Sequence, residues 1–317
     1  MTTTRGGFDP AALDEERGKL MSLAYRMLGT VADAEDAVQE TYARWYRLPE
    51  AEREAIENPA AWLTRVASRV CLDALGSARA RRERYVGEWM PEPLPRADGG
   101  WAGSAWHAVS GLPGARFEAQ QATDPLDRVS LDESVSTAML IVLESLTPAE
   151  RVAFVLHDVF AMPFAEIAEV VGRSPEACRQ LATSARRHVR ERRAGAATRE
   201  QHDAVVRAFI AAADGGDLAA LVAVLDPGVE LHSDGGGLAT AVRRPVLGAD
   251  RVARFLVGTL SKRPAMRMSV ERTADGLTLA FAEDGVVDSV AVLDVSGDRV
   301  SRIWIMRNPE KLRRWNR

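Results

Sequence analysis

The side chains best suited to chemistry are arginines that cluster between Gly172 and Arg199. This segment contains eight Arg against two Glu. Four of the arginines recur at helical spacing: Arg179, Arg186, Arg187 and Arg190. A guanidinium pairs bidentately with guanine edges and with phosphates, so the pattern indicates nucleic-acid binding. The alternative is an amphipathic helix whose arginines only face solvent.

The segment in front of these arginines predicts two short helices. Thr147 is a good N-cap, Pro148 occupies the first helical position, and Glu150 completes a capping box. A second helix is predicted to begin at Pro163 and to end at Gly172, because glycine readily adopts the left-handed conformation that terminates helices.

A third helix is predicted to begin at Ser174 and Pro175 and to continue past Arg190. A short helix, a turn of about four residues that contains glycine, and a longer helix form the helix-turn-helix pattern. The arginines therefore lie on the helix that such a motif inserts into the major groove.

Two helices of opposite charge are predicted in the all-helical segment from Asp9 to Arg84. The first turns of the helix over residues 33–47 carry acidic side chains and no basic one: Asp33, Glu35, Asp36 and Glu40. These acids favour the positive end of the helix dipole, and they also form an acidic surface that could dock on a basic partner. Helix stability alone is the competing interpretation.

The next helix, which begins at Pro59, is basic. Between Trp62 and Arg84 the sequence has six Arg against two acidic residues. Arg65 and Arg69 lie four positions apart, on a face separate from the predicted core. An acidic helix followed by a basic one in the same small domain predicts two partners, one basic and one polyanionic.

Composition indicates an ordinary folded protein with local charged patches. The chain has 317 residues, enough for two or three domains, and is 46% hydrophobic and 27% charged. A net charge of −4 excludes a globally basic nucleic-acid coat. Two distant cysteines, Cys71 and Cys178, indicate neither a disulfide framework nor a metal site, and no cofactor is expected. Without a membrane-spanning run or a signal peptide, the protein is expected to be soluble and cytoplasmic.

A proline-rich linker and a domain of another class complete the chain. The stretch GEWMPEPLPR, which follows Val86, is predicted to be stiff and extended because proline fixes backbone angles. The Gly-, Ala- and Ser-rich stretch up to Thr123 is expected to be mobile. Its Trp101 and Trp106 either pack on a neighbouring domain or belong to an insertion. From Thr198, helices followed by strands predict an α+β domain with a curved antiparallel sheet.

The segments DAEDAVQETYARWYR and NPAAWLTRVASRVCLDAL together resemble region two of bacterial extracytoplasmic-function (ECF) sigma factors. The helix-turn-helix from Leu146 resembles their region four. The resemblance implies a multi-domain protein with two all-α domains, region two at 9–86 and region four at 126–195, joined by a linker at 87–125. It implies core RNA polymerase, through its beta-prime clamp and beta flap, and promoter DNA as partners, without a membrane partner.

The same resemblance assigns residues to three contacts. Those implied for core polymerase are Asp33, Glu35, Asp36, Gln39 and Glu40. Those implied for capture and melting of the −10 element are Trp62, Arg65, Ser68 and Arg69. Those implied for the −35 element are Ser174, Glu176, Arg179, Gln180, Thr183, Arg186 and Arg187. Residues at the start of that helix should face bases, whereas those from Arg186 onward should hold phosphates.

Three short signatures relate the chain to ECF sigma factors with a fused C-terminal SnoaL-like domain, an α+β cone. That subgroup carries WLPEP, DGGGK and NPDKL. This chain has Trp89-Met90-Pro91-Glu92-Pro93, Asp234-Gly235-Gly236-Gly237-Leu238 and Asn308-Pro309-Glu310-Lys311-Leu312. Leu238 lacks the positive charge found in the subgroup. The resemblance implies a SnoaL-like domain at 198–307, a tail at 308–317, and regulation in cis through these segments. It also leaves room for an unknown small ligand in the cone.

Catalysis in the last domain is the main competing hypothesis. His232 and Asp234 lie two apart on a predicted strand, so they face the same side, and an aspartate in an apolar cavity could act as a general base. Asp234 could instead only hydrogen-bond the glycine turn. We expect no enzymatic activity. The rivals are a SnoaL-like enzyme tethered to DNA and a repressor that does not engage polymerase, although a repressor has no need of the acidic helix.

Overall fold

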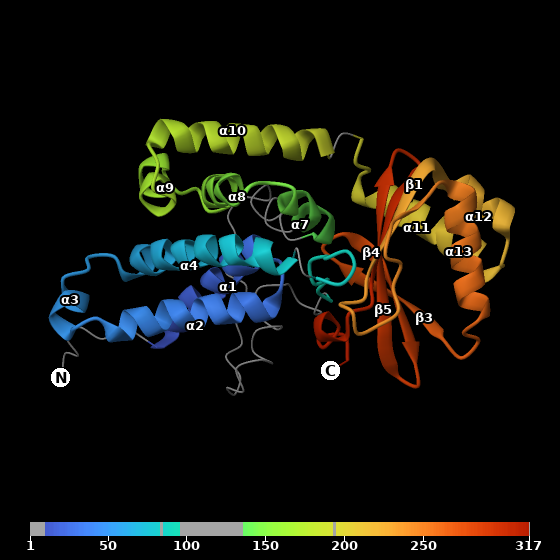
Figure 1. Ribbon diagram of the computed structural model, residues 1–317, viewed down its shortest axis with the longest axis horizontal. Coiled ribbons are helices and arrows are strands. Elements are labelled where there is room, and N and C mark those ends of the chain that lie inside the picture. The colour runs from blue at the N-terminus through green and yellow to red at the C-terminus, as the bar shows by residue number, and fades with distance from the viewer. Residues whose placement is uncertain (1–9, 83–84, 96–135, 193–194, 317) are drawn as a thin grey trace. The chain divides into compact units, whose positions relative to one another are not determined.

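The computed structural model describes residues 10–82, 85–95, 136–192 and 195–316 (Figure 1). These residues form two compact units. The first contains the residues up to Arg81 together with Val142–Val189. The second contains residues 85–95, residues 136–141 and the chain from Arg190 onward. The segment with Trp101 and Trp106, expected either to pack on a neighbouring domain or to be an insertion, lies outside the described residues.

The first unit is helical wherever the structure describes regular elements. Its N-terminal part comprises α1 (Pro10–Leu28), α2 (Val31–Arg47), α3 (Glu50–Glu54) and α4 (Pro59–Arg82). Its later part comprises α8 (Pro148–Phe154), the π-helical turn η1 (Val155–Val159), α9 (Phe164–Val171) and α10 (Pro175–Arg192). Helix α7 (Thr137–Glu144) begins in the second unit and ends in the first.

Apolar faces of α1, α2 and α4 form the core of the N-terminal part. Its fully buried side chains include Leu20 and Met27 of α1, Val38 of α2 and Leu63 of α4. The acidic residues of α2 therefore lie away from its buried face, as an amphipathic helix requires.

The predicted starts and stops of the helix-turn-helix are confirmed. The Thr147–Glu150 capping box is formed, and Gly172 ends α9 in the left-handed conformation with φ of 70°. The Ser174 hydroxyl accepts from the Ala177 amide at 3.2 Å. The π-helical turn η1 between α8 and α9 was not expected, because no local sequence signal marks it.

The second unit is an α+β domain. Its helices are α11 (Arg199–Asp214), α12 (Leu218–Val224) and α13 (Ala249–Ser261), and a short 3-10 helix η2 (Pro309–Lys311) follows the last strand. Its strands are β1 (Leu225–Asp234), β2 (Val246–Leu247), β3 (Arg267–Thr273), β4 (Gly276–Glu283), β5 (Val286–Ser296) and β6 (Arg299–Met306). They form one sheet in the order β2-β1-β6-β5-β4-β3.

The sheet is mixed rather than antiparallel throughout. Strands β3 to β6 form an antiparallel meander, which brings β6 back beside β1 in the same direction. The prediction of an antiparallel sheet is therefore wrong for this pair, in which Leu231 faces Ile303 and Asp234 faces Met306. The segment AVRRPVLG contributes only the two residues of β2 to the sheet.

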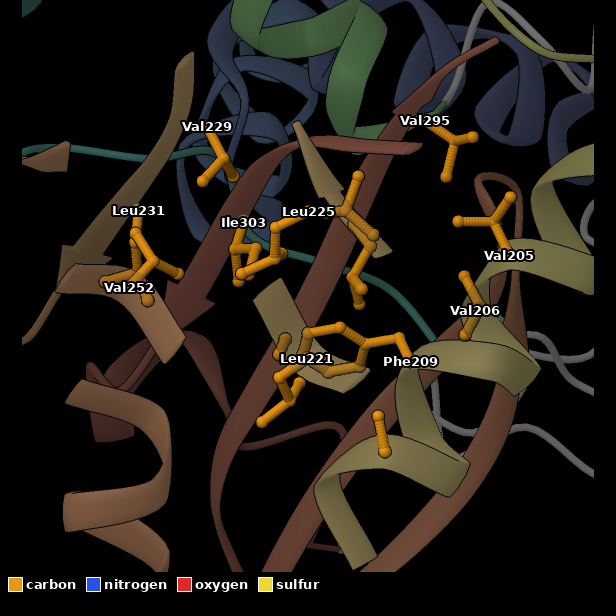
Figure 2. Packing of buried hydrophobic residues seen from close by; sticks show 14 of the residues in the cluster. Val205, Val206, Phe209, Leu221, Leu225, Val229, Leu231, Val252, Val295 and Ile303 are labelled. Carbon is orange, nitrogen blue, oxygen red and sulfur yellow. The ribbon is translucent and has the colours of Figure 1, made fainter. Parts of the chain in front are cut away.

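Apolar side chains cover both faces of this sheet. Helices α11, α12 and α13 lie on one face (Figure 1), where Phe209, Leu221 and Val252 meet strand residues such as Leu231 and Ile303 (Figure 2). A second cluster covers the opposite face and consists of Met90, Ala280, Val290, Val292, Trp304, Met306 and Leu312. The linker and the C-terminal tail therefore supply apolar cover for the face opposite α11, α12 and α13.

Candidate DNA-reading surfaces and linker lock

The residues of α2 predicted to contact polymerase differ in their exposure and in their partners. Asp36 and Gln39 are exposed. The Asp33 carboxylate accepts from the Thr30 hydroxyl at 2.6 Å, which helps to cap the helix. Glu40 forms exposed ion pairs with arginines of its own helix. Among the predicted polymerase contacts, the exposed Asp36 is therefore the acidic residue best suited to substitution.

The predicted −10 residues of α4 have different environments. The ring of Trp62 packs edge-on against Trp45, with 5.2 Å between the ring centroids. Ser68 is fully buried, and its hydroxyl donates to the Thr64 carbonyl at 2.7 Å. A DNA contact by Ser68 would therefore require its release from the core.

Arg65 and Arg69 both contact Glu169 of α9. Arg65 Nη1 lies 3.1 Å from the Glu169 carboxylate, and Arg69 Nη2 donates to the Glu169 carbonyl at 2.7 Å. The most basic part of the predicted −10 surface is thus engaged by a helix of the helix-turn-helix.

Most predicted −35 residues form an open face of α10. The exposed members are Ser174, Glu176, Arg179, Gln180, Thr183 and Arg187. The Arg179 guanidinium also lies over the Phe164 ring at 5.3 Å. Arg186 differs from its neighbour because Nε donates to Asp158 at 2.7 Å. Arg186 therefore braces α10 against the π-helical turn.

Sequence reasoning missed two buried arginines in the first unit. Arg151 donates to the Leu143 carbonyl at 2.9 Å and to the Met27 carbonyl at 2.7 Å, and it pairs with Glu144. Burial lowers the pKa of Arg151 to about 9 and that of Arg26 to about 10. No spacing signal distinguished these two arginines from those that face solvent.

Asp234 is the centre of a buried cluster in the second unit, called here the linker lock. Its carboxylate is fully buried. It accepts from the Tyr85 hydroxyl at 2.6 Å, the Met90 amide at 3.0 Å, Lys311 Nζ at 2.7 Å and the Gly236 amide at 2.9 Å. Burial and this hydrogen bond to Asp234 raise the pKa of Tyr85. The linker, the glycine turn and the tail therefore meet at one carboxylate.

Lys311 supplies the positive charge of the lock. Besides Asp234 it donates to the Met90 carbonyl at 2.6 Å, and its ammonium lies 4.3 Å from the Trp89 ring centroid. Leu238, where the subgroup has a lysine, is exposed and takes no part.

The glycine turn is shaped to receive Asn308. Gly236 has φ of 62°, and a Cβ there would collide with the Asn308 side chain. Asn308 Nδ2 donates to the Tyr85 hydroxyl at 2.8 Å. Farther along the tail, Trp315 Nε1 donates to the Pro93 carbonyl at 2.8 Å. The sequence signatures therefore contact one another directly.

His232 lies beside the lock, between two carboxylates. Its Nδ1 is 2.7 Å from Glu88 and its Nε2 is 3.1 Å from Glu230, while its ring stacks on Trp304. Burial lowers the pKa of His232, but the hydrogen bonds and charges of the two glutamates outweigh it, and the net shift is upward. His232 and Asp234 share a face as predicted, but it is the face opposite α11, α12 and α13.

The second unit also holds the first turn of α7. Asp275, in the turn between β3 and β4, accepts from the Thr137 and Ala138 amides at 2.9 Å each. Ile141 of α7 packs against the Met90 cluster. A carboxylate at a helix N-terminus satisfies free amides and favours the helix dipole. This contact to the start of α7 had no signal in the sequence.

Neither metal sites nor membrane spans emerge from the described ranges. Within them, no group of three or more His, Cys, Asp or Glu side chains is arranged to hold a metal ion. No helix among those residues combines the length and apolarity needed to cross a membrane.

Comparison with known proteins gives the family. Residues 13–81 match the family model Sigma-70 region 2, and residues 138–189 match Sigma-70, region 4. The chain is 39% identical over 307 residues to ECF RNA polymerase sigma factor SigJ of Mycobacterium tuberculosis, covering 93% of this chain and 90% of the relative. It is 36% identical over 305 residues to the probable ECF RNA polymerase sigma factor SigI of that species, covering 95% and 94%.

A solved structure agrees with these relatives. The crystal structure of Mycobacterium tuberculosis SigJ aligns with a TM-score of 0.68 at 35% identity, and the alignment covers 96% of this chain and 98% of that chain. The similarity thus includes the helical regions and the α+β domain together. The chain belongs to the ECF family of RNA polymerase sigma factors, as its two helical regions predicted.

Proposed function

We propose that this ECF sigma factor directs promoter-specific transcription initiation and that its C-terminal domain regulates it in cis through the linker lock. The observation that carries the proposal is the buried Asp234 carboxylate, which bonds the linker at Tyr85 and Met90 and the tail at Lys311. A free linker lets two DNA-reading regions adjust to their sites, whereas a linker bound along its first residues restricts them.

Regulation follows from a population of locked and released chains. The C-terminal domain binds the linker and also caps the start of α7 through Asp275. Both contacts restrain segments that connect the DNA-reading regions. A ligand or partner that favours the released form would shift the population toward chains able to bind polymerase and promoter together.

The surroundings of Asp234 support regulation rather than catalysis. A general base needs a free lone pair within reach of a substrate proton. The Asp234 carboxylate instead has four donors from the protein and lies on the sheet face covered by the linker. We therefore propose that the domain is not an enzyme and that the protein acts in the cytoplasm, where core polymerase and promoter DNA are its partners.

The polymerase partner is tested by reversing one charge on α2. Asp36→Lys changes an exposed residue opposite the buried face, so it should abolish binding to core RNA polymerase without unfolding the helix. Glu52→Lys, at an exposed site on α3, is the matched control and should bind normally. Native gel shift with purified core polymerase measures both. Normal binding by the Asp36 variant would contradict the predicted contact, whereas failure of the wild type to bind would favour a repressor that does not engage polymerase.

A further inference from the structure

We infer that Glu169 acts as an intramolecular substitute for promoter DNA, which engages the arginines of α4 and keeps the two DNA-reading surfaces in a closed form. The inference rests on the proposed −10 role of Arg65 and Arg69 and adds a regulator within the sigma regions themselves. It concerns contacts inside the first unit and does not depend on the linker lock.

The contact presents the arginines with oxygen atoms like those of a phosphate. Arg65 meets the Glu169 carboxylate at 3.1 Å, and Arg69 meets the Glu169 carbonyl at 2.7 Å. Glu169 lies in the last turn of α9, where unpaired carbonyls carry the partial negative charge of the helix dipole. A carboxylate and a helix C-terminus together resemble an anionic backbone, which guanidinium groups prefer.

The closed form cannot place both surfaces on a promoter at once. The −10 and −35 elements lie about 25 base pairs apart by position, which is about 85 Å of B-DNA at roughly 3.4 Å per base pair. Helix α10 begins at Pro175, and the chain from Glu169 to that residue spans at most about 22 Å. While Arg69 holds the Glu169 carbonyl, the start of α10 therefore stays far too close to α4.

A buried contact supports the exposed one. Arg151 of α8 donates to the Met27 carbonyl at the end of α1, and the Arg26 guanidinium lies 5.6 Å from the Phe160 ring centroid. These buried groups set the position of α8 and η1 against α1. The Glu169 carboxylate is itself 60% exposed, so it can exchange its partners for DNA without disturbing the core.

Competition with DNA gives the expected size of the effect. Exposed ion pairs are weak, so loss of the Glu169 charge should tighten DNA binding by about two- to fivefold. The apparent dissociation constant for DNA equals the intrinsic constant divided by the fraction of chains whose arginines are free. The effect should decrease at high salt, because salt screens exposed charges.

The first experiment detects the contact without DNA. In a full-length Arg65→Lys variant, a zero-length carbodiimide should join the introduced amine to Glu169, and mass spectrometry of the digested protein would identify the linked peptides. Adding Glu169→Gln removes the carboxylate and should abolish that product. Absence of the linked peptides in the Arg65→Lys chain would overturn the closed contact.

The second experiment measures affinity for fluorescein-labelled single-stranded DNA of mixed sequence by anisotropy. Glu169→Gln should bind about two- to fivefold more tightly than the wild type. Glu166→Gln has the same change of charge in the first turn of the same helix and should bind like the wild type. Equal affinities of the two variants would overturn the inference.

A third variant separates this inference from the proposed function. The double variant Arg65→Ala/Arg69→Ala should lose DNA affinity, and adding Glu169→Gln to it should cause no further gain. If the double variant binds DNA like the wild type, while the Arg65→Lys chain still forms its cross-link to Glu169, the −10 role of these arginines fails. If the double variant loses affinity but Glu169→Gln alone has no effect, only the competition by Glu169 fails.

Discussion

Lys311 Nζ lies 2.7 Å from Asp234 Oδ2, and the two side chains are only 7% and 0% exposed. The pair connects the C-terminal tail to the end of β1, and both partners also bond the backbone of Met90 in the linker. In a charge pair so deeply buried, additional hydrogen bonds help to offset the loss of hydration of both charges. Removing one partner leaves the other as an unpaired buried charge, which strongly destabilises the fold. This property makes the lock testable by single substitutions.

Removing the lysine should destabilise the C-terminal domain. Lys311→Met leaves the buried Asp234 carboxylate without its cation, which should lower the free energy of unfolding by about 3–5 kcal/mol. Urea unfolding of the full-length chain measures the change. Arg313→Met, two positions away at an exposed site, is the control and should stay close to the wild type. The buried pair would be disproved as a stabilising contact if both variants unfolded at the same urea concentration.

The contact between His232 and the linker should weaken at high pH. Because Glu88 and Glu230 raise the pKa of His232 above its usual 6.5, the charged ring stabilises the fold fully below pH 6.5. This contribution is lost as the pH rises through the raised pKa. Arg302 also lies near this site, 3.6 Å from Glu230.

Comparison with His232→Gln isolates that effect. The melting temperature of the wild type should exceed that of the variant most clearly below pH 6.5, and the difference should shrink as the pH rises. Melting curves recorded between pH 6 and pH 9 give the comparison. A difference that stays constant with pH would show that protonation of His232 does not contribute.

Two adjacent arginines on α10 should have different roles in DNA binding. Arg187 is exposed, so Arg187→Ala should weaken binding to all duplexes similarly and reduce the salt slope by about one. Arg186 is bonded to Asp158, so Arg186→Ala should mainly lower the thermal stability of the helix-turn-helix. Salt titrations of duplex binding and melting curves measure both. The assignment would be reversed if Arg186→Ala alone changed the salt slope.

Helix boundaries were predictable because their signals are local. Thr147, Gly172 and Ser174 form caps whose partners lie within a few residues, and each appears where the sequence predicted it. The acidic first turns of α2 were likewise predicted from residues close together in the sequence. The family and the α+β class of the last domain also followed from motifs and element order.

The contacts of the lock were not predictable, because their partners are distant in sequence. Tyr85 and Lys311 lie 149 and 77 positions from Asp234, and no spacing rule connects them. The strand order was not predictable for the same reason, since the parallel pairing of β1 with β6 depends on the path of all the strands between them. The contact of Glu169 with Arg69 was not predicted either, because the sequence assigned Arg69 to a polyanionic partner and gave Glu169 no role.

Run-off transcription with bacterial core RNA polymerase, on the promoter upstream of its own gene, tests the central claim most directly. The full-length chain would be compared with chains that end at Arg307, which lacks Lys311, and at Arg193, which lacks the α+β domain. The account predicts transcripts that require both core polymerase and this protein, with a yield that changes on each truncation. No transcript from any version, together with tight DNA binding by the protein alone, would contradict it.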